Sequence, residues 1–486
     1  MYDHLEVEKK WQKYWADHET FKTDVWDFSK PKFYALDMFP YPSGVGLHAG
    51  HPEGYTATDI VSRMKRMQGY NVLHPMGYDS FGLPAEQYAV QTGNNPNGFT
   101  QTNIKTFTKQ LQELGFDYDW SKMIATSDPE FYHWTQWIFK QLYKDGYAKY
   151  VDMPVNWCEE LGTVLSNDEV IDGKSERGGY PVIRKNMKQL CIDQAAFAER
   201  LLEGLNEIDW PESTKEMQRN WIGRSTGVEV QFEIVGGGKF SIFTTCIETI
   251  YGITFMVLAP DGDLVQELMP RIKNQDEVKA YIQETVSKSE MDRTELNKGK
   301  TGCRLEGIKA INPVNGREVE VFIGDFVLAN YGTGAVMAVP SHDQRDFEYA
   351  IAHNIDRIQV IEGQDVSEHA FEKQDYLGKG CKLINSEEFT GLTVEEAKVA
   401  ITKKLVDMGI AKETVNYRFR EWIFARQRYW GEPVPIVHLE DGTDYVLPDE
   451  ELPLILPELE DYKGHNGKAP LENATEWKQY NQNGVK

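Results

Sequence analysis

Apolar and polar positions along the first 80 residues alternate between two patterns, one typical of buried strands and one typical of helices. Residues 32–39 (KFYALDMF) form a short apolar run between two prolines, which predicts a buried strand. Residues 52–69 open with Pro-Glu and end with glycine, which predicts a helix with Ala57, Ile60, Met64 and Met67 on one face. Residues 70–79 (YNVLHPMGYD) predict a second strand, so the order indicates a βαβ unit.

The pattern changes at about Val228, where short alternating strands begin to dominate. We expect a separate domain at 224–417, inserted into a parent α/β fold. Residues 1–223 and 418–486 would form that parent fold, with a small turn-rich knob at about 151–190.

Composition and charge restrict the kind of protein. The five cysteines are scattered and form no Cys-x-x-Cys pair, which favours free thiols in a reducing compartment. The chain shows no secretory signal and no apolar run of membrane-spanning length, so we expect a cytoplasmic protein without a membrane partner. The net charge of −24 disfavours indiscriminate binding to nucleic acid but leaves open a selective RNA enzyme with a local basic surface.

The first candidate chemistry lies in residues 44–58 (GVGLHAGHPEGYTAT), where His48 and His51 stand three residues apart. Two histidines alone supply too few ligands for a closed metal site, although metal binding and a purely structural role both remain open. The turn follows a strand and precedes a helix, and free N–H groups at a helix N-terminus favour anions. Phosphate binding is therefore the better-supported interpretation.

Five longer stretches resemble leucyl-tRNA synthetases of the bacterial type, a class I aminoacyl-tRNA synthetase family. They are MFPYPSGVGLHAGHPEGYTATDI, HPMGYDSFGLPAE, RNWIGRSTG, YGTGAVMAVPSHDQRDFEYA and FREWIFARQRYWGEPVPI, in the family's order. The resemblance implies a Rossmann-like parallel-sheet catalytic domain, here incomplete, with an inserted mixed α/β, strand-rich editing domain. It also implies leucine activation by ATP with Mg²⁺ and transfer of leucine to tRNA(Leu), by a monomer.

The resemblance assigns roles in the catalytic domain. His48, Gly50 and His51 would hold ATP, and Asp79 would hold the ammonium group of leucine. Met38, Phe39 and Tyr41 would flank the amino-acid and adenylate pocket, with core packing as the alternative for these three. Attack of a carboxylate on a phosphate needs little acid–base help, so positioning and charge stabilisation suffice.

The resemblance also assigns an editing site, which is useful because an apolar pocket separates similar aliphatic side chains by only about 10–200-fold. Thr244 and Thr245 would line the reaction centre, and Thr249 would keep leucine out. Asp346 would anchor the substrate ammonium with Asp343 nearby, and the pocket would be shaped by Tyr331, Met337 and Val339. The alternative is that the threonines favour strands and the aspartates cap a helix.

Three departures from the family alter these expectations. Cys246, Ile247 and Glu248 replace the family's Arg-Pro-Asp, which removes a guanidinium that would bind the tRNA end, so editing is expected to be weak or absent. Cys246 has no identifiable base partner, so we do not expect it to be a nucleophile.

The other two departures concern metal and catalysis. Only Cys158 remains of the zinc ligands that some relatives carry in the knob, so we expect no zinc and no other metal site. The Lys-Met-Ser-Lys-Ser signature is absent, so we expect an N-terminal fragment that does not complete leucine activation alone. A stand-alone tRNA-proofreading deacylase and an inactive paralogue used as a binding module are the competing functions.

Overall fold

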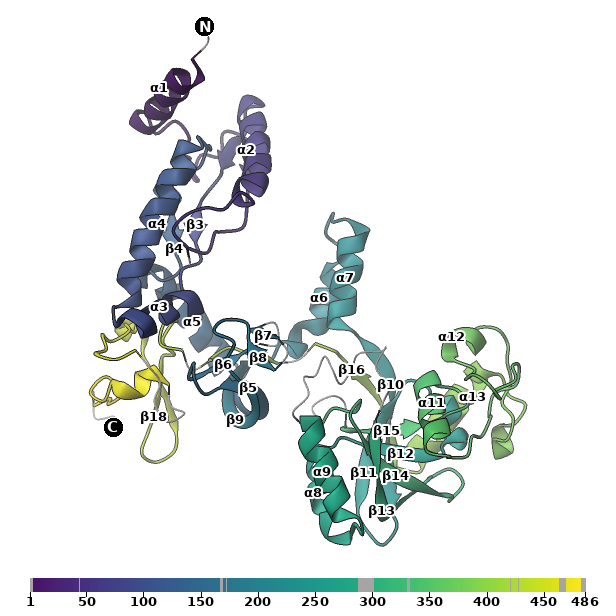
Figure 1. The fold of residues 1–486 in the computed structure, drawn as a ribbon. Helices are drawn as coiled ribbons and strands as arrows, with labels where there is room; N and C mark the ends of the chain where they lie inside the picture. The colour runs from purple at the N-terminus through teal and green to yellow at the C-terminus, as the bar shows by residue number, and fades with distance from the viewer. Residues whose placement is uncertain are drawn as a thin grey trace. The chain divides into compact units, whose positions relative to one another are not determined.

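The computed structural model describes residues 3–42, 44–166, 169–171, 173–286, 301–329, 333–419, 421–426, 428–462 and 469–481. The chain divides into two compact units, drawn as a ribbon in Figure 1. The first unit holds Met1–Val170, Ser175–Ile192 and Ile423–Lys486, and the second holds Ile171–Lys174 and Asp193–Trp422. The second unit covers more residues than the inserted domain expected at 224–417. The limits of an independently folding domain stay a prediction.

Two parallel strand pairs organise the first unit. β1 (Lys32–Tyr34) pairs with β2 (Asn71–Leu73), and helix α2 (His51–Met67) connects them, so the predicted βαβ unit is confirmed. β3 (Gly77–Tyr78) pairs in parallel with β4 (Ile124–Ala125), with α3 (Leu83–Thr92) and α4 (Pro96–Glu113) between them in the chain. The remaining helices described in residues 3–144 are α1 (His4–Asp17) and α5 (Pro129–Lys144).

Helix α2 has the predicted ends but packs through a different face. Gly50 is its N-cap and Pro52 lies in its first turn. The apolar positions Ala57, Ile60, Met64 and Met67 are all exposed, and the buried residues of the helix are Tyr55 and Ser62. The side of α2 that faces the rest of this unit therefore combines Tyr55, which packs in a hydrophobic cluster, with polar residues such as Ser62.

The knob contains a strand ladder that the sequence analysis missed. β5 (Ala148–Cys158) and β9 (Ile183–Ile192) pair antiparallel over ten residue pairs, and β6 (Thr163–Leu165) extends the ladder from β5. Short strands near the boundary between the units are β7 (Val170–Ile171), β8 (Lys174–Ser175) and β17 (Trp422–Ile423).

The C-terminal segment returns to the first unit and packs on the start of α3. Trp430 donates its Nε1–H to the carbonyl of Ser80 at 2.8 Å, and the Gly82 N–H donates to the carbonyl of Trp430 at 3.0 Å. A hairpin follows, formed by β18 (Ile436–His438) and β19 (Asp444–Val446). Residues more than 300 positions apart therefore share one wall of this unit.

The second unit is built on one large mixed sheet. Its strands lie in the order β11-β10-β13-β14-β12-β15, with β16 paired to β10, and only the β12–β14 pairing is parallel among the described pairs. The strands are β10 (Ser225–Ile234), β11 (Lys239–Thr244), β12 (Phe255–Leu258), β13 (Gly302–Ile311), β14 (Glu318–Gly324), β15 (Ala335–Ala338) and β16 (Ala411–Asn416). The helices are α6 (Ala198–Gly204), α7 (Glu212–Ile222), α8 (Asp263–Leu268), α9 (Gln275–Val286), α11 (Gln344–Ala352), α12 (Lys373–Tyr376) and α13 (Val394–Asp407). These elements confirm the predicted mixed, strand-rich domain.

The sheet of the second unit curls, so that its two end strands come together. β11 and β15 stand at opposite ends of the strand order, yet they contact each other. Beneath the sheet lies the largest hydrophobic core of the described residues, with Ile247 and Ile250 packed in the same cluster as Ile401 of α13. The curl brings the turn after β11 close to the end of β15.

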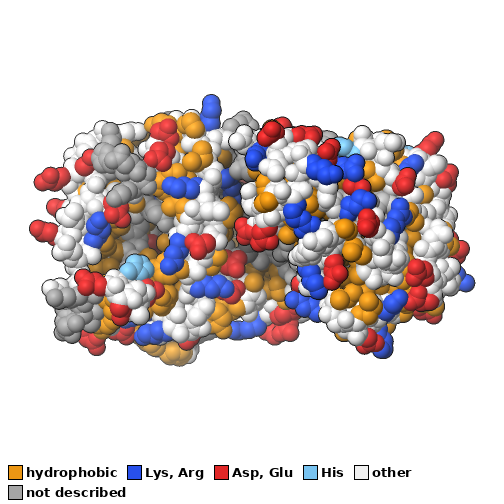
Figure 2. All heavy atoms as spheres, turned by 90° about the horizontal axis from the view of Figure 1, so that it is seen from below, with side chains coloured by type: hydrophobic (Ala, Val, Ile, Leu, Met, Phe, Trp, Pro, Cys, Tyr) orange, Lys and Arg blue, Asp and Glu red, His pale blue; other side chains and the backbone are white. Residues whose placement is uncertain are grey.

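The molecular surface carries mixed charge. On the face drawn in Figure 2, Lys and Arg side chains are interspersed with Asp and Glu. Each helix in the described ranges is either too short or too polar to span a bilayer. Any recognition of RNA on that face would therefore depend on a few well-placed cations, because basic side chains there do not gather apart from acidic ones.

Candidate functional site

His48 and His51 form a compact turn at the N-terminus of α2. The Gly50 N–H donates to His48 Nδ1 at 3.1 Å, and the His48 N–H donates to His51 Nδ1 at 3.1 Å. The two imidazole rings lie 3.8 Å apart between centroids. A Cβ at Gly50 would lie 3.1 Å from the His48 ring, so a larger residue there would require the ring to shift slightly.

These contacts settle which ring nitrogens carry protons. A backbone N–H always donates, so both Nδ1 atoms act as acceptors and the proton of each neutral ring lies on Nε2. Burial, and then the neighbouring His48, lowers the pKa of His51, which favours the neutral ring. The turn therefore offers Nε2–H donors at a helix N-terminus, an arrangement suited to an anion such as phosphate.

Two glycines let the segment after β1 lie against the segment after β2. A Cβ at Gly77 would lie 2.5 Å from the ring of Phe39, and a Cβ at Gly82 would lie 2.3 Å from the hydroxyl oxygen of Tyr41. The Tyr41 hydroxyl donates to the carbonyl of Phe81. Phe39 and Tyr41 therefore pack against Gly77 and Gly82, whereas Met38 is 83% exposed, and the pocket assigned to these three residues stays a prediction.

Asp79 lies beside these aromatic residues. Its backbone N–H donates to the carbonyl of Pro40 at 3.2 Å, and its side chain remains exposed. Burial of part of the carboxyl group raises its pKa, and a hydrogen bond from Thr126 opposes this shift. An exposed carboxylate next to an aromatic wall is suited to binding an ammonium group.

Two acidic residues near this site were missed by the sequence analysis. Glu432 lies close enough to Asp79 that the two charges interact, although burial is the main cause of its raised pKa. Asp37 accepts a hydrogen bond from Thr58 of α2 at 2.8 Å and lies next to Gly54. Glu432 belongs to a motif that carries the family resemblance and Asp37 directly precedes one, but only the folded chain shows that they adjoin the site.

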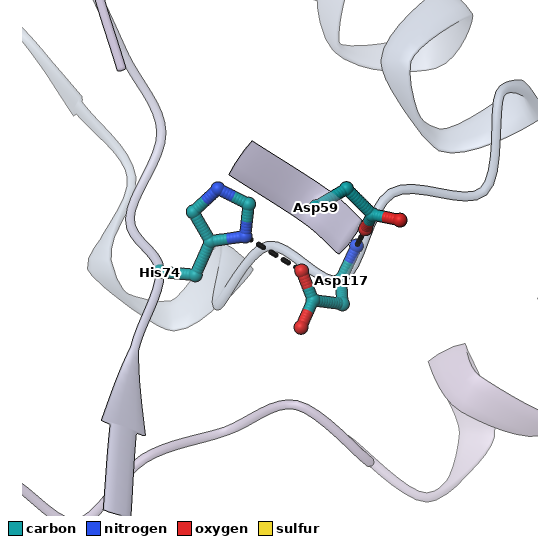
Figure 3. A group of neighbouring side chains, drawn as sticks. All are labelled: Asp59, His74 and Asp117. Atoms are coloured by element: carbon teal, nitrogen blue, oxygen red, sulfur yellow. Dashed lines mark hydrogen bonds and ion pairs between the residues drawn. The ribbon is translucent and has the colours of Figure 1, made fainter. Parts of the chain in front are cut away.

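Asp59, His74 and Asp117 are the group of potential metal ligands found among the described residues (Figure 3). His74 Nδ1 lies 2.6 Å from Asp117 Oδ1, and Asp59 Oδ1 accepts the Asp117 N–H at 2.7 Å. The other oxygens accept from Ser62 and Arg66 at Asp117, and from Arg63 at Asp59. Because every carboxylate oxygen is already hydrogen-bonded and two guanidinium groups are present, this cluster is a structural network rather than a cation site.

A cavity of about 430 Å³ also lies in the first unit, away from the predicted site residues. Aromatic side chains from α1 and from the segments around it form much of its wall: Trp15, Phe21, Phe116, Tyr118 and Trp120. Its charged groups pair with one another, for example Lys22 with Glu19 at 2.9 Å. We give more weight to the histidine turn as a site, because its polar atoms point to a defined ligand chemistry.

In the second unit, residues 244–249, here called the threonine turn, follow β11 and enter the 3₁₀ helix η4 (Ile247–Gly252). The Cys246 N–H donates to Thr244 Oγ1 at 3.0 Å, and the Thr249 hydroxyl donates to the carbonyl of Cys246 at 2.8 Å. The side chain of Thr249 is thereby fixed and almost fully buried. Thr244 is also the last residue of β11, so the editing role of the threonines stays a prediction beside the alternative that they favour a strand.

Asp343 and Asp346 lie at the start of α11 and differ in their surroundings. Asp343 is the N-cap: it accepts the N–H groups of Arg345 and Asp346 and also pairs with the Arg345 side chain. Asp346 accepts the Val339 N–H at 2.8 Å through Oδ2. Burial, and then the nearby Asp343, raises the pKa of Asp346 well above its ordinary value.

The helix η4, into which the threonine turn leads, meets Asp346 through Val339. A Cβ at Gly252, at the end of η4, would lie 2.9 Å from Val339 Cγ1, while the backbone of Val339 binds Asp346. Met337 lies in β15 opposite Met256. Tyr331, also predicted at this site, lies outside the described residues.

Cys158 is buried among apolar side chains of the knob, and burial raises the pKa of its thiol. The absence of zinc stays a prediction.

Comparison with known proteins agrees with this arrangement. Residues 10–245 match the family "tRNA synthetases class I (I, L, M and V)", and residues 219–406 match "Leucyl-tRNA synthetase, editing domain". The chain also resembles LeuRS in the solved ternary complex of Agrobacterium radiobacter K84 agnB2 LeuRS with tRNA and LeuAMS. The identity is 33% and the TM-score 0.81, with 100% of this chain and 57% of that chain covered.

The first unit thus has the fold of a class I tRNA synthetase catalytic region, and this class uses ATP with Mg²⁺. The second unit matches the leucyl-tRNA synthetase editing domain, so the chain belongs to the class I aminoacyl-tRNA synthetases of the leucyl type. It spans 57% of the length of the LeuRS chain that it matches.

Proposed function

We propose that this chain hydrolyses the ester of tRNA(Leu) that carries a wrong amino acid, at the site formed by the threonine turn and Asp346. The observation that carries the proposal is the approach of η4, which holds the fixed, buried Thr249, to Val339, whose N–H binds the Asp346 carboxylate. Such a site offers one group for the substrate ammonium and one wall that limits the size of the side chain.

The roles of the residues follow from their contacts. Asp346 would bind the substrate ammonium through Oδ1 while the Val339 N–H holds Oδ2. The hydroxyl groups of Thr244 and Thr245 would lie beside the ester carbon. Water would attack that carbon, the bond to the ribose oxygen would break, and that oxygen would take up a proton. Catalysis would rest on positioning, since no residue here is identified as a general base.

A second candidate function, leucine activation with Mg²⁺-ATP as substrate, is favoured by the histidine turn. The Nε2–H groups of His48 and His51 would donate to phosphate oxygens, and Asp79 would bind the ammonium of leucine. Leucine-dependent exchange of pyrophosphate into ATP by the 486-residue polypeptide is the measurement that tests this function. Observing this exchange would contradict the expectation of an inactive fragment.

A pair of substitutions at Thr249 tests the hydrolytic function. Thr249→Ala opens space in the wall, so hydrolysis of correctly charged Leu-tRNA(Leu) is expected to rise by about 10–200-fold, the range set by one or two methyl groups. Thr249→Val keeps the volume but removes the bond to the Cys246 carbonyl, so it should still exclude leucine. Release of amino acid from Ile-tRNA(Leu) and Leu-tRNA(Leu) is the measurement.

The outcomes separate the competing functions. Hydrolysis of Ile-tRNA(Leu) that disappears in Asp346→Ala supports the proposal. Absence of hydrolysis by the wild type, in a chain that still binds tRNA(Leu), would instead favour the binding-module alternative.

A further inference from the structure

Two lysines from different helices converge on Thr245 in the threonine turn. Lys373 Nζ, at the start of α12, lies 3.5 Å from Thr245 Oγ1, and Lys398 Nζ of α13 donates to the Thr245 carbonyl at 2.9 Å. Both side chains are half-buried. Neither forms an ion pair with a carboxylate in the ranges that the structure describes, so two ammonium charges meet at this turn without a bound counter-charge.

The acidic residue nearest in sequence does not neutralise them. Glu248 is fully buried, accepts a hydrogen bond from Tyr376 at 3.2 Å through Oε1, and leaves Oε2 without a partner. Burial raises the pKa of Glu248, whereas Lys398 and Lys373 lower it through space. A carboxyl group that tends to hold its proton leaves the two lysines with a net positive field.

The lysines share the site that contains Asp346. The segment just before Lys373 runs along the start of α11: the Phe371 N–H donates to the carbonyl of Ser341 at 2.9 Å, and the Ala370 N–H donates to Gln344 Oε1 at 3.0 Å. Lys373 therefore extends from the neighbourhood of the aspartates to the threonine turn, and cationic and anionic groups lie within one site.

The charges of an aminoacyl-tRNA end match this arrangement. Its amino acid carries one ammonium group and its carboxyl group is a neutral ester, so the nearest anion is the phosphodiester that precedes the terminal adenosine. We propose that Lys373, with Lys398 beside it, binds this phosphodiester and supplies the positive charge that the turn lacks at Cys246. The inference rests on the proposed hydrolytic function, because that function places the ammonium at Asp346.

The chemistry of lysine sets the expected strength of this contact. An ammonium group is a point charge without the planar fork of arginine, so it attracts a phosphate but orients it poorly. Loss of Lys373 should therefore raise KM for the mischarged tRNA more than it lowers kcat.

Binding of short RNA to the full chain tests the inference without requiring hydrolysis. The probes are a tetranucleotide ending in CCA and the same RNA with a neutral methylphosphonate at its last linkage, measured in a His51→Ala background to weaken binding at the histidine turn. The wild-type editing site should bind the charged probe about 5–10-fold more tightly than the neutral one. Lys373→Gln should abolish this difference, and Lys373→Arg should keep it.

Matched controls make the result specific. Lys379→Gln removes an exposed lysine six residues away and should leave the difference unchanged. An RNA probe with the methylphosphonate at the preceding linkage should bind more weakly than the charged probe, by the same factor in Lys373→Gln and in its parent. A charge preference that persists in Lys373→Gln, or no measurable binding of either probe, overturns the inference. If the charge preference depends on Lys373 in a chain that hydrolyses no ester, the inference is upheld and the proposed function is contradicted.

Discussion

At the residue scale, Asp346 shows how binding and stability oppose each other. Burial and Asp343 raise its pKa, so the folded protein disfavours the ionised carboxyl group that an ammonium ligand needs. A raised pKa means that the folded state binds a proton more tightly than the unfolded chain. Asp346 therefore lowers stability as pH rises from the unfolded value toward its folded value.

Asp346→Asn removes this opposition. The amide keeps an oxygen for the Val339 N–H but carries no charge, so we expect the second unit to melt at a higher temperature at neutral pH while hydrolysis is lost. For a domain of this size, each 1 kcal/mol corresponds to about 2–4 °C in Tm. Asp343→Asn keeps the helix cap and removes only the smaller cause of the raised pKa, so its gain should be smaller, and an equal gain in both variants would contradict this account.

Candidate site residues could be named where several local signals coincide. His48, His51 and Asp79 were named because turn, helix start and family motif lie within a few positions, and their roles stay predictions. Lys373 and Glu432 were not found, since their relevance depends on segments more than 100 positions away. No periodicity in a single sequence encodes such contacts.

At the element scale, helix ends were easier to predict than helix faces. Pro52 in the first turn of α2 and Gly223 after α7 mark helix ends through fixed backbone preferences, and α2 starts within one residue of its predicted start. The apolar face of α2 gave no guide to its packing, because Ser62, Arg63 and Arg66 attach the helix through hydrogen bonds instead. The β5–β9 ladder was missed because turns around residues 157–182 dominated the local signal.

Asp117→Asn should loosen α2, because this carboxylate joins Ser62 and Arg66 of the helix to His74. Burial opposes its ionisation, but the bonds from His74 and Ser62 lower its pKa below the ordinary value. Removing one partner of a buried ion pair costs about 3–5 kcal/mol, so we expect a loss of that order in the unfolding free energy of the first unit.

Tryptophan fluorescence in a denaturant titration measures this loss, since most of the 12 tryptophans lie in the first unit. Asp145→Asn, at an exposed carboxylate after α5, is the control and should stay within about 0.5 kcal/mol. Equal stability in the two variants would show that the network does not anchor the helix.

At the scale of the whole molecule, each unit has its own core, and the second depends on distant segments meeting at one point. His342 joins three of them: its Nδ1 lies 3.0 Å from the Phe371 carbonyl, and its Nε2 accepts the N–H groups of Val360 and Ile361. The strand order of this unit could not be read from the sequence, whereas its strand-rich character could.

Acid should destabilise the second unit through His342. Burial lowers its pKa to about 4, against about 6.5 in the unfolded chain, so between these values only the unfolded state binds the proton. Its stabilising effect is complete above pH 6.5 and is lost as pH falls toward 4, by up to about 3 kcal/mol. In His342→Gln this dependence should disappear, whereas His369→Gln, at an exposed histidine, should keep it; thermal melts from pH 7 to pH 4 provide the measurement.

The histidine turn before α2 has one more consequence. Because both Nδ1 atoms accept backbone N–H groups, a proton or a soft metal ion that sought these atoms would first have to break the turn. A metal ion that ligated these rings without breaking the turn would therefore have to bind through Nε2, in place of the proton there.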